Sequence, residues 1–521
     1  MSSAPAGTTT PAPDPQRWKA LAFIGFAQLM VVLDATIVNI ALPHAQADLQ
    51  FSDASRQWVI TAYSLAFGGL LIAGGRLGDL WGRKRVFLTG LIGFALASAL
   101  GGAAVNTGML LGARALQGPF AALLAPAALS LVAVTFPDGR ERAKAFGIFS
   151  AIAGGGGAVG LLLGGVLTEY VDWRWCLYVN VVFAVVAATG AVCSVHARNE
   201  QRNRDRLDVP GAVLGTAGLV ALVYGFSRAE EAGWTAGTTI ALFITAAVLL
   251  AAFVLVERRV AAPLLPLRVV TDRNRAGAFL GVGLAMIGMF AQFLFMAYWF
   301  QLVAGYSPLT SGFAFLPHIA GLIIGTTQIA TRLSGRVPVR RIMVPGLLLA
   351  ALGMLLLTRL TADSSYWALV MPATVLLGIG MGAAFMPAMT LATLGIRPQD
   401  AGVASAMVNT SQQVGGSIGT ALLNTIAAGA TTGWIATHAG ADPAQAAVHG
   451  YVTAFWWATA IMLLAALLVA VLVRADHRTS APTTADDKPT NPASRSWPPE
   501  PATTTNYRED APRCATSSWA T

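Results

Sequence analysis

Apolar runs of about twenty residues recur along nearly the whole chain, and they restrict its fold more than any other feature. A run of that length can cross a hydrocarbon core of about 30 Å as a single α-helix. Only 11% of the residues are charged, whereas a soluble domain carries about 25%. The sequence therefore predicts an all-α polytopic membrane protein.

The runs predict about fourteen spanning helices. The first run is too long for the short apolar core of a cleavable signal peptide, so we expect it to be retained as a span. The expected spans are 18–42, 57–78, 86–105, 108–134, 144–167, 176–196, 209–227, 237–256, 275–300, 310–332, 342–359, 366–391, 402–428 and 449–473.

Basic residues gather in alternate connections between the expected spans. These clusters begin at Arg83, Arg140, Arg198, Arg258 and Arg332. The positive-inside rule then places both termini in the cytoplasm, which an even number of spans permits. This distribution also accounts for the net charge of +9 without a nucleic-acid partner.

A weak internal repeat suggests that the chain is built from two halves. GRKRVFLTGL (82–91) aligns with PVRRIMVPGL (338–347), although basic residues flank many cytoplasmic helix starts and the match can be coincidental. Secondary transporters often have duplicated halves with the substrate site between them. We therefore expect six-helix bundles at 18–196 and 275–473, with linkers and two inserted helices at 197–274.

The segments outside these regions have a different composition. Residues 1–17 and 474–521 are polar and rich in Pro and Thr. We expect both to be disordered and cytoplasmic, because they contain too little apolar surface to form a core.

Asp34, within VVLDATIVNIALP (31–43), is the only acid expected near the middle of a span. It lies roughly 12 Å from the outer end of its helix. A charge at such a depth costs about 2.5–3.5 kcal/mol on insertion scales. A buried carboxyl group favours its protonated form and a hydrated one its charged form, which is what a proton carrier requires.

Arg114 is the corresponding exception among the bases, roughly 9 Å inside its span. A guanidinium close to Asp34 would favour the charged carboxylate, and its withdrawal would favour the protonated form. The two residues can therefore form a proton-release switch. A fixed structural ion pair is the alternative, and the sequence leaves both open.

Two glycine-rich stretches predict unusual backbone packing. In GRLGDLWGRKR (75–85), Gly75, Gly78 and Gly82 allow a tight turn between two helices. Asp79 can pair with Arg83 or cap another helix; a simple cytoplasmic turn is the alternative.

The second stretch is AIAGGGGAVGLLLGGVL (151–167). Small residues let membrane helices pack with their backbones in contact. A row of glycines of this kind can form a static contact with a neighbouring helix, or it can let the two helices slide, and both interpretations are compatible with the sequence.

Polar side chains inside other spans are candidates for a substrate pocket. Aromatic and Met residues with a few polar groups suit an adaptable apolar pocket, although ordinary interhelical packing explains any one of them equally well. His318 is expected to be a packing histidine that is hydrogen-bonded between helices, with titration near neutral pH as the alternative. The candidate substrate residues are Asp34, Asn39, Tyr63, Gln292, Phe295, Asn409 and Gln413.

Other chemistries find no support in the sequence. The spacing of Cys176, Cys193 and Cys514 matches no metal or disulfide framework. There is no nucleotide-binding loop, metal-ligand cluster or nucleophile triad. We therefore expect no enzyme activity, no cofactor and no metal.

Several motifs together resemble the major facilitator superfamily, in particular its fourteen-helix drug:proton antiporter branch of the EmrB/QacA type. The resemblance covers about residues 20–473. It rests on LDATIVNIALP (33–43), GRLGDLWGRKR (75–85), RALQG (114–118), WRWCLYVN (173–180), DVPG (208–211), GYSPLTSGFAFLP (305–317), GIGMGAAFMP (378–387) and DAGVASAMVNTSQQVGGSIGTALL (400–423).

The resemblance implies a major facilitator fold of two six-helix bundles with two extra central helices, working by alternating access. It further implies that Asp34, Arg114 and Gln117 couple transport to protons. By the same similarity, Asp79 and Arg83 belong to a cytoplasmic latch, together with Gly75, Gly78 and Gly82.

The antiporter motif of the fifth helix is implied by Gly156, Gly160, Gly164 and Gly165. This sequence departs from the motif at Leu161, where the family has proline. The glycines are kept but the proline kink is lost.

Two functions are compatible with these features. The first is proton-coupled export of amphipathic small molecules such as antibiotics. The second is a proton-independent or symport facilitator for a metabolite. A sensor or channel is less well supported, because the tails are short and polar. We expect a monomer in a bacterial plasma membrane, whose partners are the lipid bilayer, protons and a small-molecule substrate.

Overall fold

A computed structural model describes residues 16–136, 139–195, 208–260, 263–334, 336–393, 401–438 and 442–474. They belong to one compact unit, Met1–Thr479, and Ser480–Thr521 form a second unit outside the described residues. Within the described ranges the regular structure is entirely helical. Eleven of the helices there are long and apolar enough to cross a membrane.

Eight helices come first in the described part of the chain. They are α1 (Arg17–Leu49), α2 (Asp53–Trp81), α3 (Arg83–Gly102), α4 (Thr107–Thr135), α5 (Gly139–Tyr170), α6 (Trp175–Ser194), α7 (Val209–Ala232) and α8 (Gly237–Arg259).

The second part of the chain contains three π-helical segments that continue or begin longer helices. Its elements are α9 (Leu267–Thr271), α10 (Arg273–Tyr298), η1 (Trp299–Val303), α11 (Pro308–Ile324), η2 (Gly325–Ala330), α12 (Thr331–Leu333), α13 (Arg340–Leu357), η3 (Tyr366–Val370), α14 (Met371–Thr393), α15 (Ala401–Thr437) and α16 (Pro443–Leu472).

Each of the fourteen predicted spans coincides with a long helical segment, and the all-α fold class is confirmed. Several predicted ends were too early, most of all in α1, which continues past Pro43 to Leu49, and in α15, which continues to Thr437. Hydropathy marks the end of an apolar run, but a helix can extend beyond it into polar sequence. Proline is tolerated within membrane helices because neighbouring groups pair with the freed carbonyl.

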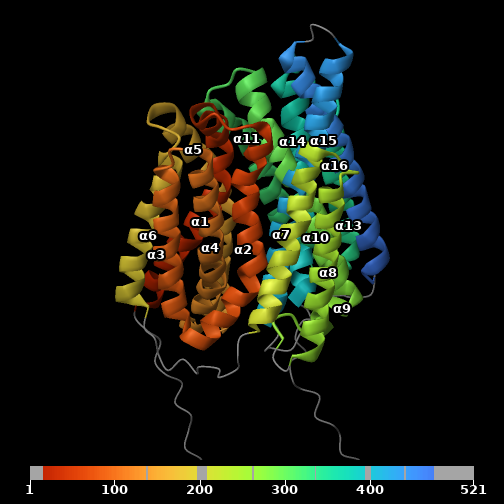
Figure 1. The fold of residues 1–521 in the computed structure, drawn as a ribbon. Helices are drawn as coiled ribbons and strands as arrows, with labels where there is room; N and C mark the ends of the chain where they lie inside the picture. The colour runs from red at the N-terminus through yellow and green to blue at the C-terminus, as the bar shows by residue number, and fades with distance from the viewer. Residues whose placement is uncertain are drawn as a thin grey trace, which may run out of the picture. The chain divides into compact units, whose positions relative to one another are not determined.

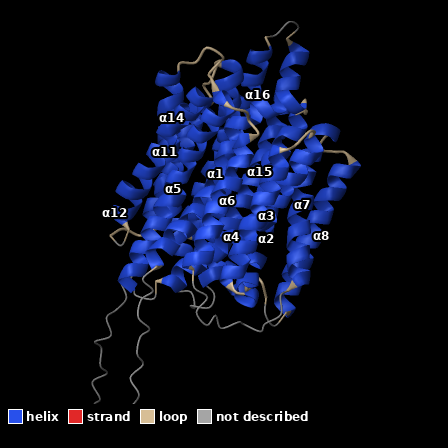
Figure 2. Ribbon diagram, turned by 90° about the vertical axis from the view of Figure 1, so that its left-hand side faces the viewer, coloured by secondary structure: helices blue, strands red, loops and turns tan. Residues whose placement is uncertain are grey.

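The long helices lie side by side, and sequence-distant helices are in contact (Figure 1). α2 packs along α15, and α5 packs along α11. α7 and α8 lie to one side, where α7 contacts α2 and α15 while α8 packs mainly on α7 (Figure 2). α8 consequently leaves most of its apolar surface exposed, as expected for a helix that faces lipid.

The glycines of α5 form a seam against its neighbours. A Cβ on Gly156 would stand 3.1 Å from Leu29 and Val32 of α1, and one on Gly164 would stand 2.9 Å from Ile37. On the opposite side, a Cβ on Gly165 would stand 2.6 Å from the backbone of Leu309 in α11. The predicted backbone contact is therefore observed, and it joins α1, α5 and α11.

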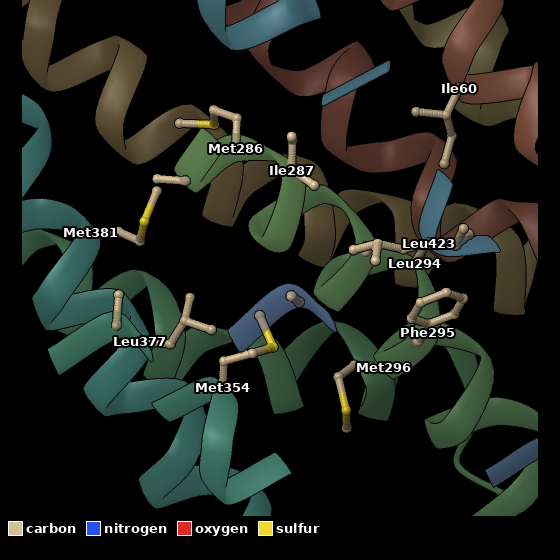
Figure 3. Close-up of a cluster of buried hydrophobic side chains, with 14 of the residues drawn as sticks. Ile60, Met286, Ile287, Leu294, Phe295, Met296, Met354, Leu377, Met381 and Leu423 are labelled. Carbon is tan, nitrogen blue, oxygen red and sulfur yellow. The ribbon is translucent and has the colours of Figure 1, made fainter. Parts of the chain in front are cut away.

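A cluster of buried apolar side chains fills the space between α10, α13 and α14. Figure 3 shows Met286, Met381, Leu377 and Met354 among the side chains that these three helices contribute to the cluster. Unbranched methionine side chains fill irregular spaces between helices that cross at different angles.

Gly74 lies where the backbones of α2 and α4 come close together, and it allows a test of this contact. A Cβ at Gly74 would overlap the carbonyl group of Ala122 in α4, whereas a Cβ at Gly78, one turn further on, would meet nothing within 4 Å. We expect Gly74→Ala to lower the free energy of unfolding by about 1–3 kcal/mol, because overpacking moves a backbone.

The matched control is Gly78→Ala, which adds the same methyl group to the same helix. Thermal unfolding of the purified proteins in detergent measures both effects. Equal unfolding midpoints for the two variants would contradict the packing described for α2 and α4.

Candidate proton and substrate site

Asp34 lies on α1 and is completely buried, at 0% exposure. Its carboxylate accepts three hydrogen bonds. Arg114 Nη1 donates to Oδ2 at 2.7 Å, while Gln117 Nε2 and Asn180 Nδ2 donate to Oδ1 at 3.1 and 2.7 Å. The charged carboxylate is thus fully paired inside the bundle, as a buried anion must be.

Arg114 of α4 has further partners around its guanidinium. Its Nε donates to the carbonyl of Val59 at 2.9 Å, and Nη1 also donates to Gln117 Oε1 at 2.7 Å. The guanidinium carbon stands 4.4 Å from the centre of the Tyr63 ring. The cation is therefore held by charge, hydrogen bonds and an aromatic face.

Local sequence explains this convergence. Arg114 and Gln117 are three residues apart and so share a face of α4. Gln117 Nε2 also donates to Ser98 Oγ of α3 at 2.6 Å. Gly118 brings α2 close, because a Cβ there would stand 2.9 Å from the Tyr63 carbonyl oxygen. Five helices, α1, α2, α3, α4 and α6, thus contribute to one polar network.

The network has unused hydrogen-bonding capacity. Among the described residues, Tyr63 Oη and Asn180 Oδ1 are buried without a hydrogen-bond partner. Buried polar atoms are normally paired, so such atoms indicate room for water, a proton or a ligand group.

A cavity reaches Arg114 from the side toward the C-terminal end of α1. Its walls are apolar apart from the guanidinium and the Cys176 thiol. It is lined by Val38, Ala41, Leu42, Ala45, Val59, Leu110, Arg114, Trp173, Cys176 and Leu177.

The other candidate substrate residues are spread along the interior. Asn39 donates to the carbonyl of Ala35 on its own helix at 3.1 Å. Gln413 packs against α2, where a Cβ on Gly68 would stand 2.7 Å from it. Asn409 lies one turn before Gln413 on the same helix and is half-buried. These residues do not join the Asp34 network.

Two candidates on α10 differ in their surroundings. Gln292 is fully buried, and its amide has no hydrogen-bond partner among the described residues. Phe295 stacks on Tyr451 of α16 at 5.2 Å, so it packs in the core on that side of α10. His318 packs edge-on against Phe293 with ring centres 5.0 Å apart. Both of its ring nitrogens are buried without a hydrogen-bond partner among the described residues, so the expected hydrogen bond is not observed.

Of the three glycines expected at the turn between α2 and α3, only Gly82 lies at it, because Gly75 and Gly78 lie inside α2. Gly82 adopts φ +96°, a backbone conformation that favours glycine. A Cβ on Gly75 would stand 3.6 Å from the side chain of Pro126 in α4, which is an ordinary van der Waals contact. The side chain of Asp79 lies outside the described residues, so the expected pair with Arg83 stays a prediction.

Asn180 and Ser98 were not singled out by the sequence analysis. Asn180 stands in WRWCLYVN (173–180), which contributed only to the family resemblance. A lone polar residue in an apolar run is the available signal, but it does not distinguish ordinary packing from a site.

The expected span 57–78 leaves Arg56 in the preceding connection, which is wrong because α2 begins at Asp53. It is 7% exposed, and its Nη2 donates to Asn424 Oδ1 of α15 at 2.7 Å. Its guanidinium carbon also stands 4.3 Å from the Tyr298 ring centre.

Comparison with known proteins identifies the family to which this chain belongs. The Major Facilitator Superfamily profile matches residues 24–420, so the chain belongs to the major facilitator superfamily. It is a multi-pass membrane transport protein and not an enzyme.

Among its relatives is the puromycin resistance protein pur8 of Streptomyces alboniger, 53% identical over 90% of this chain and 93% of that protein. The cephamycin export protein CmcT of Amycolatopsis lactamdurans is 39% identical over 87% of this chain and 92% of that one. The probable actinorhodin transporter of Streptomyces coelicolor is 34% identical over 81% and 74%.

Solved structures agree on the fold. The POT family transporter PepTSo superposes with a TM-score of 0.65 at 14% identity, covering 89% of this chain and 98% of that one. A bacterial homologue of the human lysosomal transporter Spinster gives a TM-score of 0.61 at 16% identity, with coverage of 88% and 98%.

The buried pair makes a prediction about stability. We expect Arg114→Met to lower the free energy of unfolding by about 3–5 kcal/mol when Asp34 stays charged, because it leaves an uncompensated buried anion. Adding Asp34→Asn to that variant should recover part of the loss.

Thermal unfolding of the wild type, Arg114→Met, Asp34→Asn and the double variant forms a double-mutant cycle that measures the interaction between the two residues. Strictly additive losses would contradict a direct interaction, because residues in one ion pair show a coupling energy.

Proposed function

We propose that this protein exports amphipathic antibiotic-like molecules in exchange for protons, by alternating access. The observation that carries the proposal is Asp34, a fully buried carboxylate paired with Arg114 at 2.7 Å. Intramembrane ionisable residues are by default functional. The names of the relatives, which include puromycin resistance and cephamycin export, indicate the class of substrate.

The network can exchange a proton without leaving a bare charge. When Asp34 binds a proton, Arg114 keeps its bonds to the Val59 carbonyl and Gln117 Oε1, and its cation keeps the Tyr63 ring. Gln117 likewise keeps Ser98. Protonation therefore breaks only the bonds to the carboxylate, which lowers the cost of switching between the two states.

Protons reach this network through the cavity beside Arg114, in our proposal. The cavity lies between Asp34 and the end of α1 that the charge distribution assigns to the outside. Because its walls are mostly apolar, a small change in helix packing suffices to wet or dry it.

Contacts between the two parts of the chain support an outwardly closed state. Tyr298 donates to Gln46 Oε1 at 2.6 Å, and Gln301 of η1 donates to the Ile40 carbonyl at 3.1 Å. Leu309 N donates to Glu169 Oε2 at 3.0 Å. All of these join elements of the first half to elements of the second at the same end, where α1 terminates.

Alternating access would open that end by breaking these bonds. In this proposal the halves 18–196 and 275–473 move relative to each other. The stretch 75–85, which ends α2 and begins α3, acts as the latch on the cytoplasmic side. We also assign the protein to the bacterial inner membrane with both termini in the cytoplasm, and we take it to act as a monomer.

Asp34→Asn provides the functional test. The amide cannot carry the exchanged proton, so we expect normal membrane insertion and a loss of proton-driven efflux of at least about tenfold. Everted membrane vesicles with an imposed proton gradient and puromycin as the probe measure the transport.

The control is Asp48→Asn, the same change of charge on the same helix. Asp48 lies at the exposed end of α1 and bonds to Trp173 and Arg174. Efflux that is insensitive to the gradient in the wild type would favour the proton-independent facilitator, and gradient-driven efflux retained by Asp34→Asn would remove Asp34 from the coupling.

A further inference from the structure

Two buried carboxyl groups meet at the end of the inserted helices where α7 begins and α8 ends. Asp208 and Glu257 are each 4% exposed. They are distant in sequence from Asp34 and take no part in its network. Nothing in the transport mechanism described above uses them.

Each carboxyl group has one paired and one unpaired oxygen. Asp208 Oδ1 caps α7 by accepting from Gly211 N at 2.9 Å, and Glu257 Oε2 accepts from Leu265 N at 3.0 Å. In the part of the chain that the structure describes, Asp208 Oδ2 and Glu257 Oε1 have no hydrogen-bond partner.

The two unpaired oxygens lie beside the same backbone position. A Cβ on Gly211 would clash with Asp208 Oδ2 and would stand 2.9 Å from Glu257 Oε1. Glycine at this position therefore leaves room for the two carboxyl groups to approach each other. The DVPG stretch (208–211) thus provides an acid, a helix start and the space beside it.

Few other charges face this pair among the residues that the structure describes, which begin again at Asp208 after position 195. Arg76 of α2 is close, and its Nη2 donates to the Pro263 carbonyl at 2.9 Å. Arg258 and Arg259 of α8 are exposed. α15, which also packs against α7, contains no ionisable residue between Ala401 and Thr437.

Two adjacent anions in this environment would repel each other and would leave two buried acceptors without a donor. A single proton removes the repulsion between the two anions. It also pairs the two free oxygens, since a protonated carboxyl group donates a hydrogen bond that its neighbour accepts. A divalent cation fits less well, because it requires six or more oxygen ligands and these two residues offer two free oxygens.

We propose that Asp208 and Glu257 form a second proton-binding site, in which the two carboxyl groups share one proton. The site is tied to α2 through one short connection. In this connection, Leu265 N donates a hydrogen bond to Glu257 of α8. Two residues earlier, the carbonyl of Pro263 accepts a hydrogen bond from Arg76 of α2. Once the shared proton is lost, the two carboxylates repel each other. This repulsion acts on Glu257, and through Glu257 on the attachment of this connection to α8 beside the end of α2.

Infrared titration of the full chain in lipid nanodiscs tests the site directly. At neutral pH the wild type should show a protonated-carboxyl C=O stretching band that disappears as the pH rises. Glu257→Gln and Asp208→Asn should each remove this band, whereas Asp34→Asn should keep it. Both variants preserve the local bonds, because an amide oxygen accepts as before and Asn caps a helix as well as Asp.

Thermal stability gives an independent readout. The folded pair holds a proton that the unfolded chain releases, so wild-type stability should fall as the pH rises through the titration of the band. Glu257→Gln should be nearly insensitive over the same range, because its amide donates to Asp208 at every pH.

The proposal is overturned if the wild type lacks the band at neutral pH, or if the band survives in Asp208→Asn and Glu257→Gln alike. Loss of the band on addition of Ca²⁺ at neutral pH would also overturn it, in favour of a metal site. None of these readouts depends on transport, so failure here is distinguishable from failure of proton-coupled export.

Discussion

The pairing of Asp34 with Arg114 is the constraint on which the rest of the first half depends. A carboxylate at this depth is stable only when charge and hydrogen bonds replace water. α1, α4 and α6 supply those bonds, and α2 and α3 hold the side chains that make them. Insertion of the acid into the bundle thereby dictates which faces of five helices must converge.

Close helix contact is the second requirement, and it is met by small residues. Gly118 lets α2 approach α4 beside Tyr63, and the α5 glycines bring α1 and α11 together. Leu161 replaces the proline of the antiporter motif, yet its carbonyl oxygen is still approached by Gly312, whose Cβ would stand 2.6 Å away. The contact between α5 and α11 therefore persists without the proline.

Hydropathy was enough to predict the spans, and intramembrane charge was enough to predict Asp34 and Arg114, whereas Gln117 was predicted only from the family resemblance. Neither signal reveals which neighbour a helix face meets. Asn180 looked like any packing residue, and Arg56 looked like a loop charge until α2 was found to begin before it. Asp208 and Glu257 are 49 positions apart as numbered in the chain, and only tertiary structure brings their unpaired oxygens together.

The central claim is that Asp34 exchanges a proton for substrate. Adding puromycin to purified protein in weakly buffered detergent solution, and following the pH with an indicator dye, tests it most directly. The account predicts proton release on substrate addition to the wild type and none from Asp34→Asn. Binding of puromycin without proton release by the wild type, or equal release by both proteins, would contradict it.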